Sequence, residues 1–121
     1  MRKLGLKAKV TGAVVGALMV GGAMVGTAAP ALAEDTCPYP YVCFYNFSGH
    51  ITGKFQDVTS YWQWLSSSYG AYMGRNTRHD DIVFYHFTNG QVICSPPQTT
   101  YFFNSWVVDA VRIDWASTCP P

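Results

Sequence analysis

Residues 42–48 read VCFYNFS, and residues 82–88 read IVFYHFT, so the chain repeats a short aromatic segment about forty positions later. β-Branched and aromatic residues dominate both copies, which favours strands. Successive side chains of a strand point to opposite faces, so Val42 and Phe44 share one face while Tyr45 lies on the other. Because both faces carry apolar groups, we expect this strand to be covered on both sides.

Further matches occur at the same offset and in the same order. They pair TSYW with TTYF, and Ala71 and Met73 with Val111 and Ile113. Three such clusters predict a duplicated unit of about forty residues, with units at roughly 37–78 and 79–121. On this alignment Phe44 and Phe84 occupy equivalent environments. The alternative is a coincidence among strand-favouring residues.

Turn residues separate the apolar segments. Asn89-Gly90 lies between DIVFYHFT and QVIC, and Asn-Gly between apolar strands is a strong hairpin signal. In the first copy, Gly49 and Gly53 are the corresponding turn residues. No long stripe of apolar residues at helical spacing occurs after residue 33. The pattern predicts an all-β sandwich of two four-stranded Greek-key-like units, each burying the aromatic face of the other.

The first 33 residues have the features of a secretory signal peptide. A basic start precedes an apolar segment at 10–29, and Ala31-Leu32-Ala33 is a cleavage signal of the A-x-A type. The alternative is a membrane anchor, although five glycines dilute the apolar segment and Pro30 lies where a signal peptide would be cut. We expect cleavage before Glu34, a secreted extracellular protein that is not membrane-anchored, and a single domain at 34–121.

Composition limits the partners of residues 34–121. Four of the eight Lys and Arg lie before position 34 and all seven acids after it, which leaves a formal charge of −3. Without a basic patch, nucleic acid is not an expected partner. A domain of this size buries a modest share of its surface, so large aromatic side chains and covalent bonds must compensate. We expect a monomer.

Four cysteines lie in this part of the chain, and an exported small domain with an even count predicts two disulfides. Three pairings are possible, and we favour Cys37 with Cys43 and Cys94 with Cys119. The loop-entropy estimate for these pairs is about 2 and 3.5 kcal/mol. A zinc site is the alternative, but no C-x-x-C pair is present. We expect no metal and no cofactor.

The segment 94–100 reads CSPPQTT and follows a predicted strand. Two prolines restrict the backbone and favour extended geometry before them, and a disulfide at Cys94 would anchor one side. A substrate-like protease inhibitor needs such a stiff segment, because rigidity lowers the entropic cost of binding. The candidate inhibitory loop comprises Ile93, Cys94, Ser95, Pro96, Pro97, Gln98 and Thr99. The alternative is a plain connection between sheets.

Trp62 and Trp64 form a second candidate surface, because two tryptophans two residues apart share one face of a strand. Exposed aromatic side chains can stack on sugars or bind proteins. Trp62 is aligned with Phe102 in the repeat, however, which favours a shared core position instead.

The opening C-P-x-x-x-V-C-F-Y of residues 37–45, followed by GKFQD and by YW, resembles the actinobacterial secreted peptidase inhibitor family I36. The resemblance covers most of residues 37–115. It implies a βγ-crystallin-like fold and inhibition of a metalloprotease or subtilisin-like enzyme by occupation of its active-site cleft. Tyr45 to Gly53 is one residue longer than the crystallin pattern, and the hydroxyl residues of its calcium sites are absent after DDIVFY.

Three functions follow from these observations. The first is a secreted inhibitor whose partner is an extracellular protease. The second is a cell-wall or carbohydrate-binding module that uses Trp62 and Trp64, and the third is a small secreted toxin on the same scaffold. No spacing typical of a catalytic Ser, His and Asp set occurs, and an even cysteine count leaves no free thiol, so we do not expect an enzyme.

Overall fold

The computed structural model describes residues 34–121, and Glu34–Pro121 form one compact unit. The predicted signal peptide at 1–33 lies outside the described residues. Residues 34–121 contain strands and turns but no helix, so the all-β prediction is confirmed. It follows that no helix in the described part of the chain could cross a membrane.

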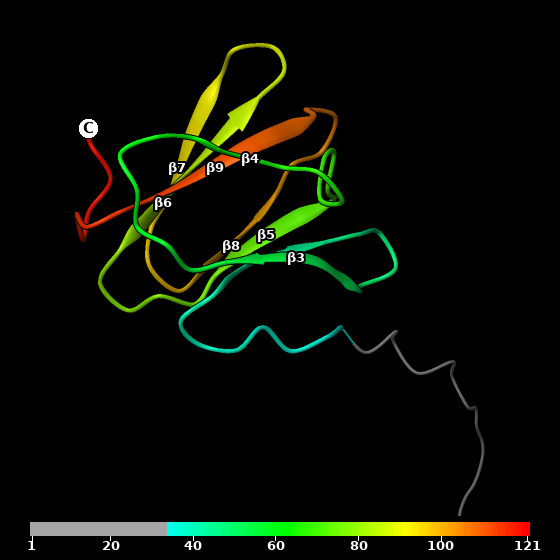
Figure 1. The fold of residues 1–121 in the computed structure, drawn as a ribbon, viewed down its shortest axis with the longest axis horizontal. Coiled ribbons are helices and arrows are strands. Elements are labelled where there is room, and N and C mark those ends of the chain that lie inside the picture. The colour runs from blue at the N-terminus through cyan, green and yellow to red at the C-terminus, as the bar shows by residue number, and fades with distance from the viewer. Residues whose placement is uncertain (1–33) are drawn as a thin grey trace, which may run out of the picture. The chain divides into compact units, whose positions relative to one another are not determined.

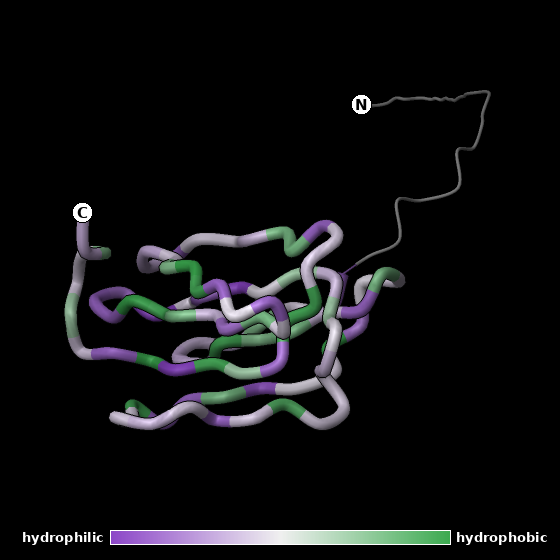
Figure 2. Tube along the Cα trace, turned by 90° about the horizontal axis from the view of Figure 1, so that it is seen from above, coloured by the Kyte–Doolittle hydropathy of each residue, from purple (hydrophilic) through white to green (hydrophobic). Residues whose placement is uncertain are grey.

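Eight strands form two antiparallel sheets (Figure 1). The first sheet has the order β3-β2-β5-β8, with bounds Ile51–Phe55, Val42–Tyr45, Met73–Asn76 and Thr99–Phe102. The second has the order β4-β9-β6-β7, with bounds Gln63–Trp64, Val108–Asp114, Ile82–Phe87 and Val92–Ser95. Hydrophobic and hydrophilic stretches alternate along the strands (Figure 2), as expected for sheets with one face in the core.

The two sheets do not coincide with the two sequence units. The first unit supplies β2, β3 and β5 to the first sheet, and its remaining strand, β4, pairs with β9 in the second sheet. The second unit supplies β6, β7 and β9 to the second sheet, and its remaining strand, β8, pairs with β5 in the first sheet. The sequence predicted two four-stranded units, and the structure has two four-stranded sheets that each take one strand from the other unit. The short strand β4 has only two paired residues, so it is held in place mainly by its partner.

The core lies between the inner faces of the sheets. Its fully buried members include Val42 and Phe44 from β2 and Val83, Tyr85 and Phe87 from β6. Phe44 meets the ring of Tyr85 edge-on, with centroids 5.7 Å apart. Each sheet therefore covers the aromatic face of the other, as the sequence predicted.

The alignment of the two aromatic strands β2 and β6 is nevertheless wrong by one residue. Phe44 is fully buried in the core, whereas Phe84 lies on the outer face of the second sheet under the guanidinium of Arg112. The residue that occupies the place of Phe44 is Tyr85. A shift of one position exchanges the two faces of a strand, so the matching letters of the two FY pairs point in opposite directions.

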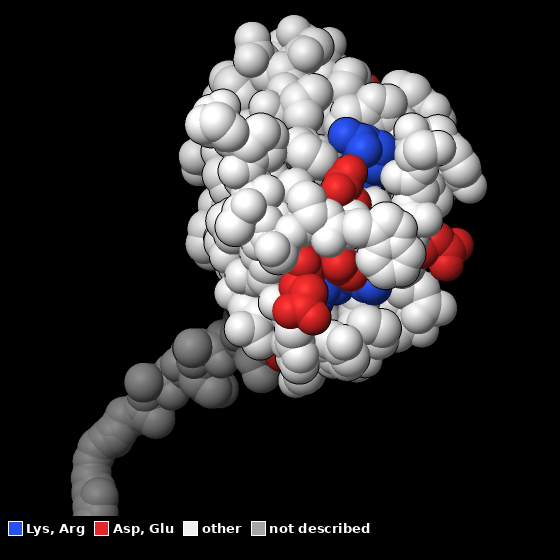
Figure 3. Space-filling view, turned by 90° about the vertical axis from the view of Figure 1, so that its left-hand side faces the viewer, with Lys and Arg blue, Asp and Glu red and all other residues white. Residues whose placement is uncertain are grey.

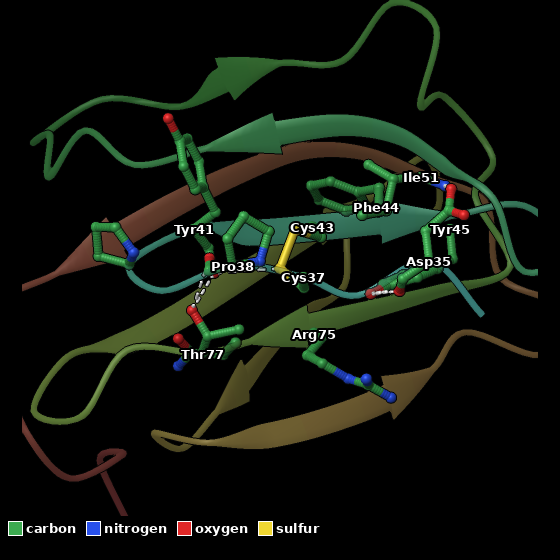
Figure 4. Close-up of a disulfide and its surroundings, with 12 residues drawn as sticks. Asp35, Cys37, Pro38, Tyr41, Cys43, Phe44, Tyr45, Ile51, Arg75 and Thr77 are labelled. Carbon is green, nitrogen blue, oxygen red and sulfur yellow. Dashed lines mark hydrogen bonds between the residues drawn. A yellow bond between two sulfur atoms is a disulfide. The ribbon is translucent and has the colours of Figure 1, made fainter. Parts of the chain in front are cut away.

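Residues 34–41 cover the outer face of β2, as Figure 4 shows. The disulfide between Cys37 and Cys43 ties this segment to the strand. The Tyr45 hydroxyl donates to the carbonyl of Asp35 at 2.8 Å, and the Asp35 carboxylate accepts from the amide of Ile51 at 2.9 Å. The second face of β2 is thereby buried by the chain's own N-terminal segment.

Arg78 anchors the link between the two units. Its side chain is largely buried and pairs with the carboxylate of Asp81 at 2.6 Å. It also donates to the carbonyls of Pro40 and Gln56, at 3.0 and 3.1 Å. A single guanidinium therefore joins three segments, a role suited to its several fixed donors.

The second disulfide joins Cys94 of β7 to Cys119, across a sequence separation of 25 residues. It fixes the C-terminal segment to the edge strand of the second sheet. Two disulfides in a domain of this size indicate an oxidising, extracellular environment.

Candidate functional site

The connection between β7 and β8 carries the chain from one sheet to the other. Ser95 is the last residue of β7 and is fully buried, and Thr99 is the first residue of β8. The turn between them consists of Pro96, Pro97 and Gln98. Pro96 and Gln98 are exposed, and Gln98 has a φ of 56°, which reverses the chain direction.

A buried side chain holds this turn. The amide nitrogen of Asn76 donates to the carbonyl of Pro96 at 3.1 Å and to the carbonyl of Asp81 at 2.9 Å. Asn76 has no exposed surface. On the other side of the turn, the Thr99 hydroxyl donates to the carbonyl of Pro97 at 3.1 Å. The turn is therefore fixed by side chains as well as by its prolines.

These contacts reduce the extent of the predicted inhibitory loop. Ile93, Cys94 and Ser95 belong to β7, with Cys94 in a disulfide, and Thr99 belongs to β8. Only Pro96–Gln98 lie outside the strands. The segment is the sheet-to-sheet connection that the sequence left open as an alternative, and its accessible part is three residues long.

A hollow of about 340 Å³ opens beside this turn. Gln98 and Thr100 line it on one side, and Tyr39 and His79 line it on the other. The Tyr39 and His79 rings stack with centroids 4.4 Å apart, and Tyr39 is 61% exposed. The turn thus stands next to an aromatic wall supplied by the N-terminal segment and by the link between the units.

Arg75 also lines this hollow. Its Nε donates to the Thr100 hydroxyl at 2.9 Å, and its terminal nitrogen pairs with Glu34 at 3.2 Å. The guanidinium also lies over the ring of Tyr45, 5.6 Å from its centroid. Burial raises the pKa of the Tyr45 phenol, and Arg75 partly opposes this shift. These contacts hold the guanidinium in a fixed orientation.

The second candidate surface lies on the outer face of the second sheet. Trp62 and Trp64 both contact the ring of His86, with centroid distances of 5.2 and 5.8 Å. They share one face, as predicted. Trp64 is 65% exposed, whereas Trp62, for which the alignment favoured a core position, is partly buried and lies outside the core cluster. With Phe44 matched to Tyr85, Tyr45 matches His86, and their partners Met73 and Ala110 match in turn. Phe102 pairs with Met73 and Trp64 pairs with Ala110, so Phe102 matches Trp64, and it is also exposed.

Charged groups in residues 34–121 are mostly paired with one another. Three ion pairs in this part of the chain join arginine and carboxylate side chains, among them Arg112 with Asp114 at 3.1 Å. The rings of His50 and His86 lie 3.6 and 2.6 Å from the carboxylates of Asp35 and Asp109. On the face in Figure 3, charged atoms gather in small clusters of both signs within a largely uncharged surface. No group of three potential metal ligands occurs among the residues that the structure describes.

Sequence reasoning missed Asn76, Tyr39 and His79 as neighbours of the turn. Asn76 lies in the sequence GRN, which has no feature of a functional motif. Only the pairing of β5 with β8 brings its side chain within hydrogen-bonding distance of the Pro96 carbonyl. Tyr39 and His79 are about forty residues apart in the sequence. No local pattern could have predicted their stacking.

Comparison of the chain with protein-family models, curated proteins and solved structures finds no match.

Proposed function

We propose that this chain is a secreted inhibitor of an extracellular protease, either a metalloprotease or a subtilisin-like enzyme. The turn Pro96–Gln98 enters the active-site cleft, and the wall formed by Tyr39 and His79 contacts the rim. The protein acts by binding as a monomer, without catalysis and without a cofactor. It leaves the cell by means of the predicted signal at 1–33.

We further propose that the fold is βγ-crystallin-like, with two Greek-key units, as the resemblance to the I36 inhibitors implies. The strand orders β3-β2-β5-β8 and β4-β9-β6-β7 support this proposal. Each order places the third strand of one unit beside the fourth strand of the other. Each sheet therefore contains three strands of one unit and the third strand of the other, as expected for a duplicated Greek key.

The observation that carries the inhibitor proposal is the bond from Asn76 to the turn. A segment that enters a protease cleft loses affinity if it must first be ordered, and it is cut easily if it can move. The buried Asn76 amide holds the Pro96 carbonyl at 3.1 Å, and Asn76 is itself fixed because its side-chain oxygen accepts from the amide of Arg78 at 3.0 Å. The turn is thus ordered before any partner arrives.

The second disulfide supports the same function. Cys94 precedes the turn and Cys119 follows it. If a protease cuts the chain between Pro96 and Gln98, the two pieces stay covalently joined and the strands on either side remain paired. The cut ends are then held together, which favours religation and slows release.

The test is a titration against a thermolysin-like and a subtilisin-like protease. The full chain is expressed in a secreting bacterial host and purified from the medium. We expect inhibition of at least one of the two enzymes. Replacing Pro96 and Pro97 by glycine should weaken inhibition by about tenfold or more, because the turn then loses its order.

Gln91→Ala is the matched control, because Gln91 is an exposed turn residue between β6 and β7. This variant should inhibit like the unaltered protein. If the unaltered protein inhibits neither class, the function is wrong. If it inhibits and the double glycine variant does so equally well, the protease contacts another surface.

A further inference from the structure

A row of three tryptophans crosses the outer face of the second sheet. Trp64 and Trp62 belong to β4 and its approach, and adjacent positions on one face of a strand are about 7 Å apart. Because β4 runs antiparallel to β9, the direction from Trp64 to Trp62 continues toward the end of β9 and Trp115. Trp64 and Trp115 are 65% and 76% exposed.

The far end of this row is hollowed. Thr59, Ser60, Arg112, Asp114 and Trp115 line a depression of about 220 Å³. This volume is below the range typical of pockets for drug-sized ligands, so it suits one ring of a larger molecule. The rest of such a molecule would lie across the exposed indole of Trp64 and the partly buried indole of Trp62.

Polar groups beside the indoles are held in fixed positions. The Arg112 guanidinium lies over Phe84 and Trp62, at 4.6 and 5.4 Å from the ring centroids, and donates to Asp114 at 3.1 Å. The Asp114 carboxylate also accepts from the amide of Ala116 at 2.9 Å. Donors and acceptors are thus ordered at the edges of the aromatic row, which lowers the entropic cost of binding a ligand.

The Asp109 and Asp114 carboxylates of this face both have hydrogen-bond partners. Arg112 donates to Asp114 at 3.1 Å, and the His86 ring, which contacts Trp62 and Trp64, lies 2.6 Å from the Asp109 carboxylate. A charged ligand would therefore find no side-chain charge without a partner among these residues. Charged residues are depleted at the centres of protein–protein interfaces. Here charged residues lie beside every exposed indole of the row, so this face does not have the composition typical of the centre of a protein interface. This arrangement favours a neutral ligand with apolar faces and hydroxyl edges.

We propose that this face binds a neutral, linear β-linked glycan, independently of any protease inhibition. One pyranose ring stacks on Trp64, a second contacts the exposed part of Trp62, and another occupies the hollow beside Trp115. Arg112 donates to ring hydroxyls and Asp114 accepts from them. Indoles that follow one another along a strand direction suit an extended chain of β-1,4-linked rings better than a coiled α-1,4-linked chain.

The indole N–H groups of the full secreted protein report on binding directly. Hexasaccharides of β-1,4-linked N-acetylglucosamine and of β-1,4-linked glucose are titrated to millimolar concentration, and proton–nitrogen correlation spectra are recorded. The signals of Trp62, Trp64 and Trp115 should shift, and that of Trp106 should not. Trp106 is the internal control, because it packs on Phe87 away from the row. An α-1,4-linked glucose hexasaccharide should bind more weakly.

Variants then assign the site. Trp64→Ala and Trp115→Ala should each weaken binding by about tenfold or more, and Trp106→Ala should not change it. Absence of shifts with both β-linked hexasaccharides would overturn the proposal, as would equal binding by Trp64→Ala. If Trp64→Ala instead loses protease inhibition, the face is a protein contact and the glycan assignment is wrong.

Discussion

Replacing Tyr85 by phenylalanine should make this protein more stable. The Tyr85 ring is fully buried in the core, packed edge-on against Phe44 and Phe103. Its hydroxyl has no hydrogen-bond partner, and the same holds for the buried hydroxyl of Ser95. A buried hydroxyl without a partner has lost its bonds to water and gained nothing in return.

The expected gain follows from this loss. An unsatisfied buried donor costs about 1–3 kcal/mol, and the small void left by one oxygen offsets part of the gain. We therefore expect the free energy of unfolding to rise by about 1 kcal/mol at neutral pH. In a domain of this size such a change raises the midpoint of thermal unfolding by about 4–8 °C.

The difference between the two proteins should grow in alkali. Burial raises the pKa of the Tyr85 phenol far above its ordinary value, and the nearby Ser95 hydroxyl opposes this only in part. In the unfolded chain the phenol loses its proton near pH 10, while the folded protein still holds it. Stability from this group is therefore complete below pH 10 and falls above it, by about 1.4 kcal/mol for each pH unit. Tyr85→Phe lacks this loss.

Urea unfolding at several pH values between 7 and 11 measures both effects, with Tyr61→Phe as the control because Tyr61 is 67% exposed. A less stable Tyr85→Phe protein at neutral pH would mean that the hydroxyl has a partner. A difference that stays constant above pH 10 would refute a neutral buried phenol. A cycle with Ser95→Ala measures the coupling between the two hydroxyls, which should be smaller than that of a full hydrogen bond because neither has a partner at hydrogen-bonding geometry.

Three further substitutions test the packing. Gly74→Ala should cost about 1–3 kcal/mol, because an added Cβ would lie 2.6 Å from the Tyr85 hydroxyl oxygen; unaltered urea unfolding would contradict this close approach. Arg78→Lys should cost about 3 kcal/mol in the same measurement, since one ammonium cannot serve three segments, whereas a neutral result would show that its buried carboxylate partner finds another donor. Serine at both Cys94 and Cys119 should cost about 3.5 kcal/mol for the 25-residue loop, and reductant should then change the unfolding curve less than in the unaltered protein.

The sequence predicted the class of the fold but not which residues of each strand face the core. Aromatic and β-branched segments separated by Asn89-Gly90 and other turns are enough to predict two packed sheets, because strands with two apolar faces need cover. The error of one residue between Phe44 and Phe84 arose because identical letters were aligned. Which residue faces the core depends on register, and hairpins of different length change the register without changing the local pattern.

At the candidate sites, too, the sequence predicted the local features but not the contacts between distant segments. The sequence placed Trp62 and Trp64 on one face, because that follows from the period of a strand. It did not predict that this face is exposed, since exposure depends on which sheet β4 joins. The stiffness of Pro96-Pro97 was predictable from proline alone, whereas the support from Asn76 depends on a contact across 20 residues of sequence.

The exchange of β4 and β8 has a consequence for how such a chain could arise and be divided. A half-length chain holding only one unit would have three strands of a sheet and a fourth with nowhere to pair, so it would be incomplete alone. Two identical copies would complete each other by reciprocal insertion. A symmetric dimer of half-length chains is therefore a plausible ancestor in physical terms, and two separately made halves of the present protein should recombine into one folded pair rather than fold individually.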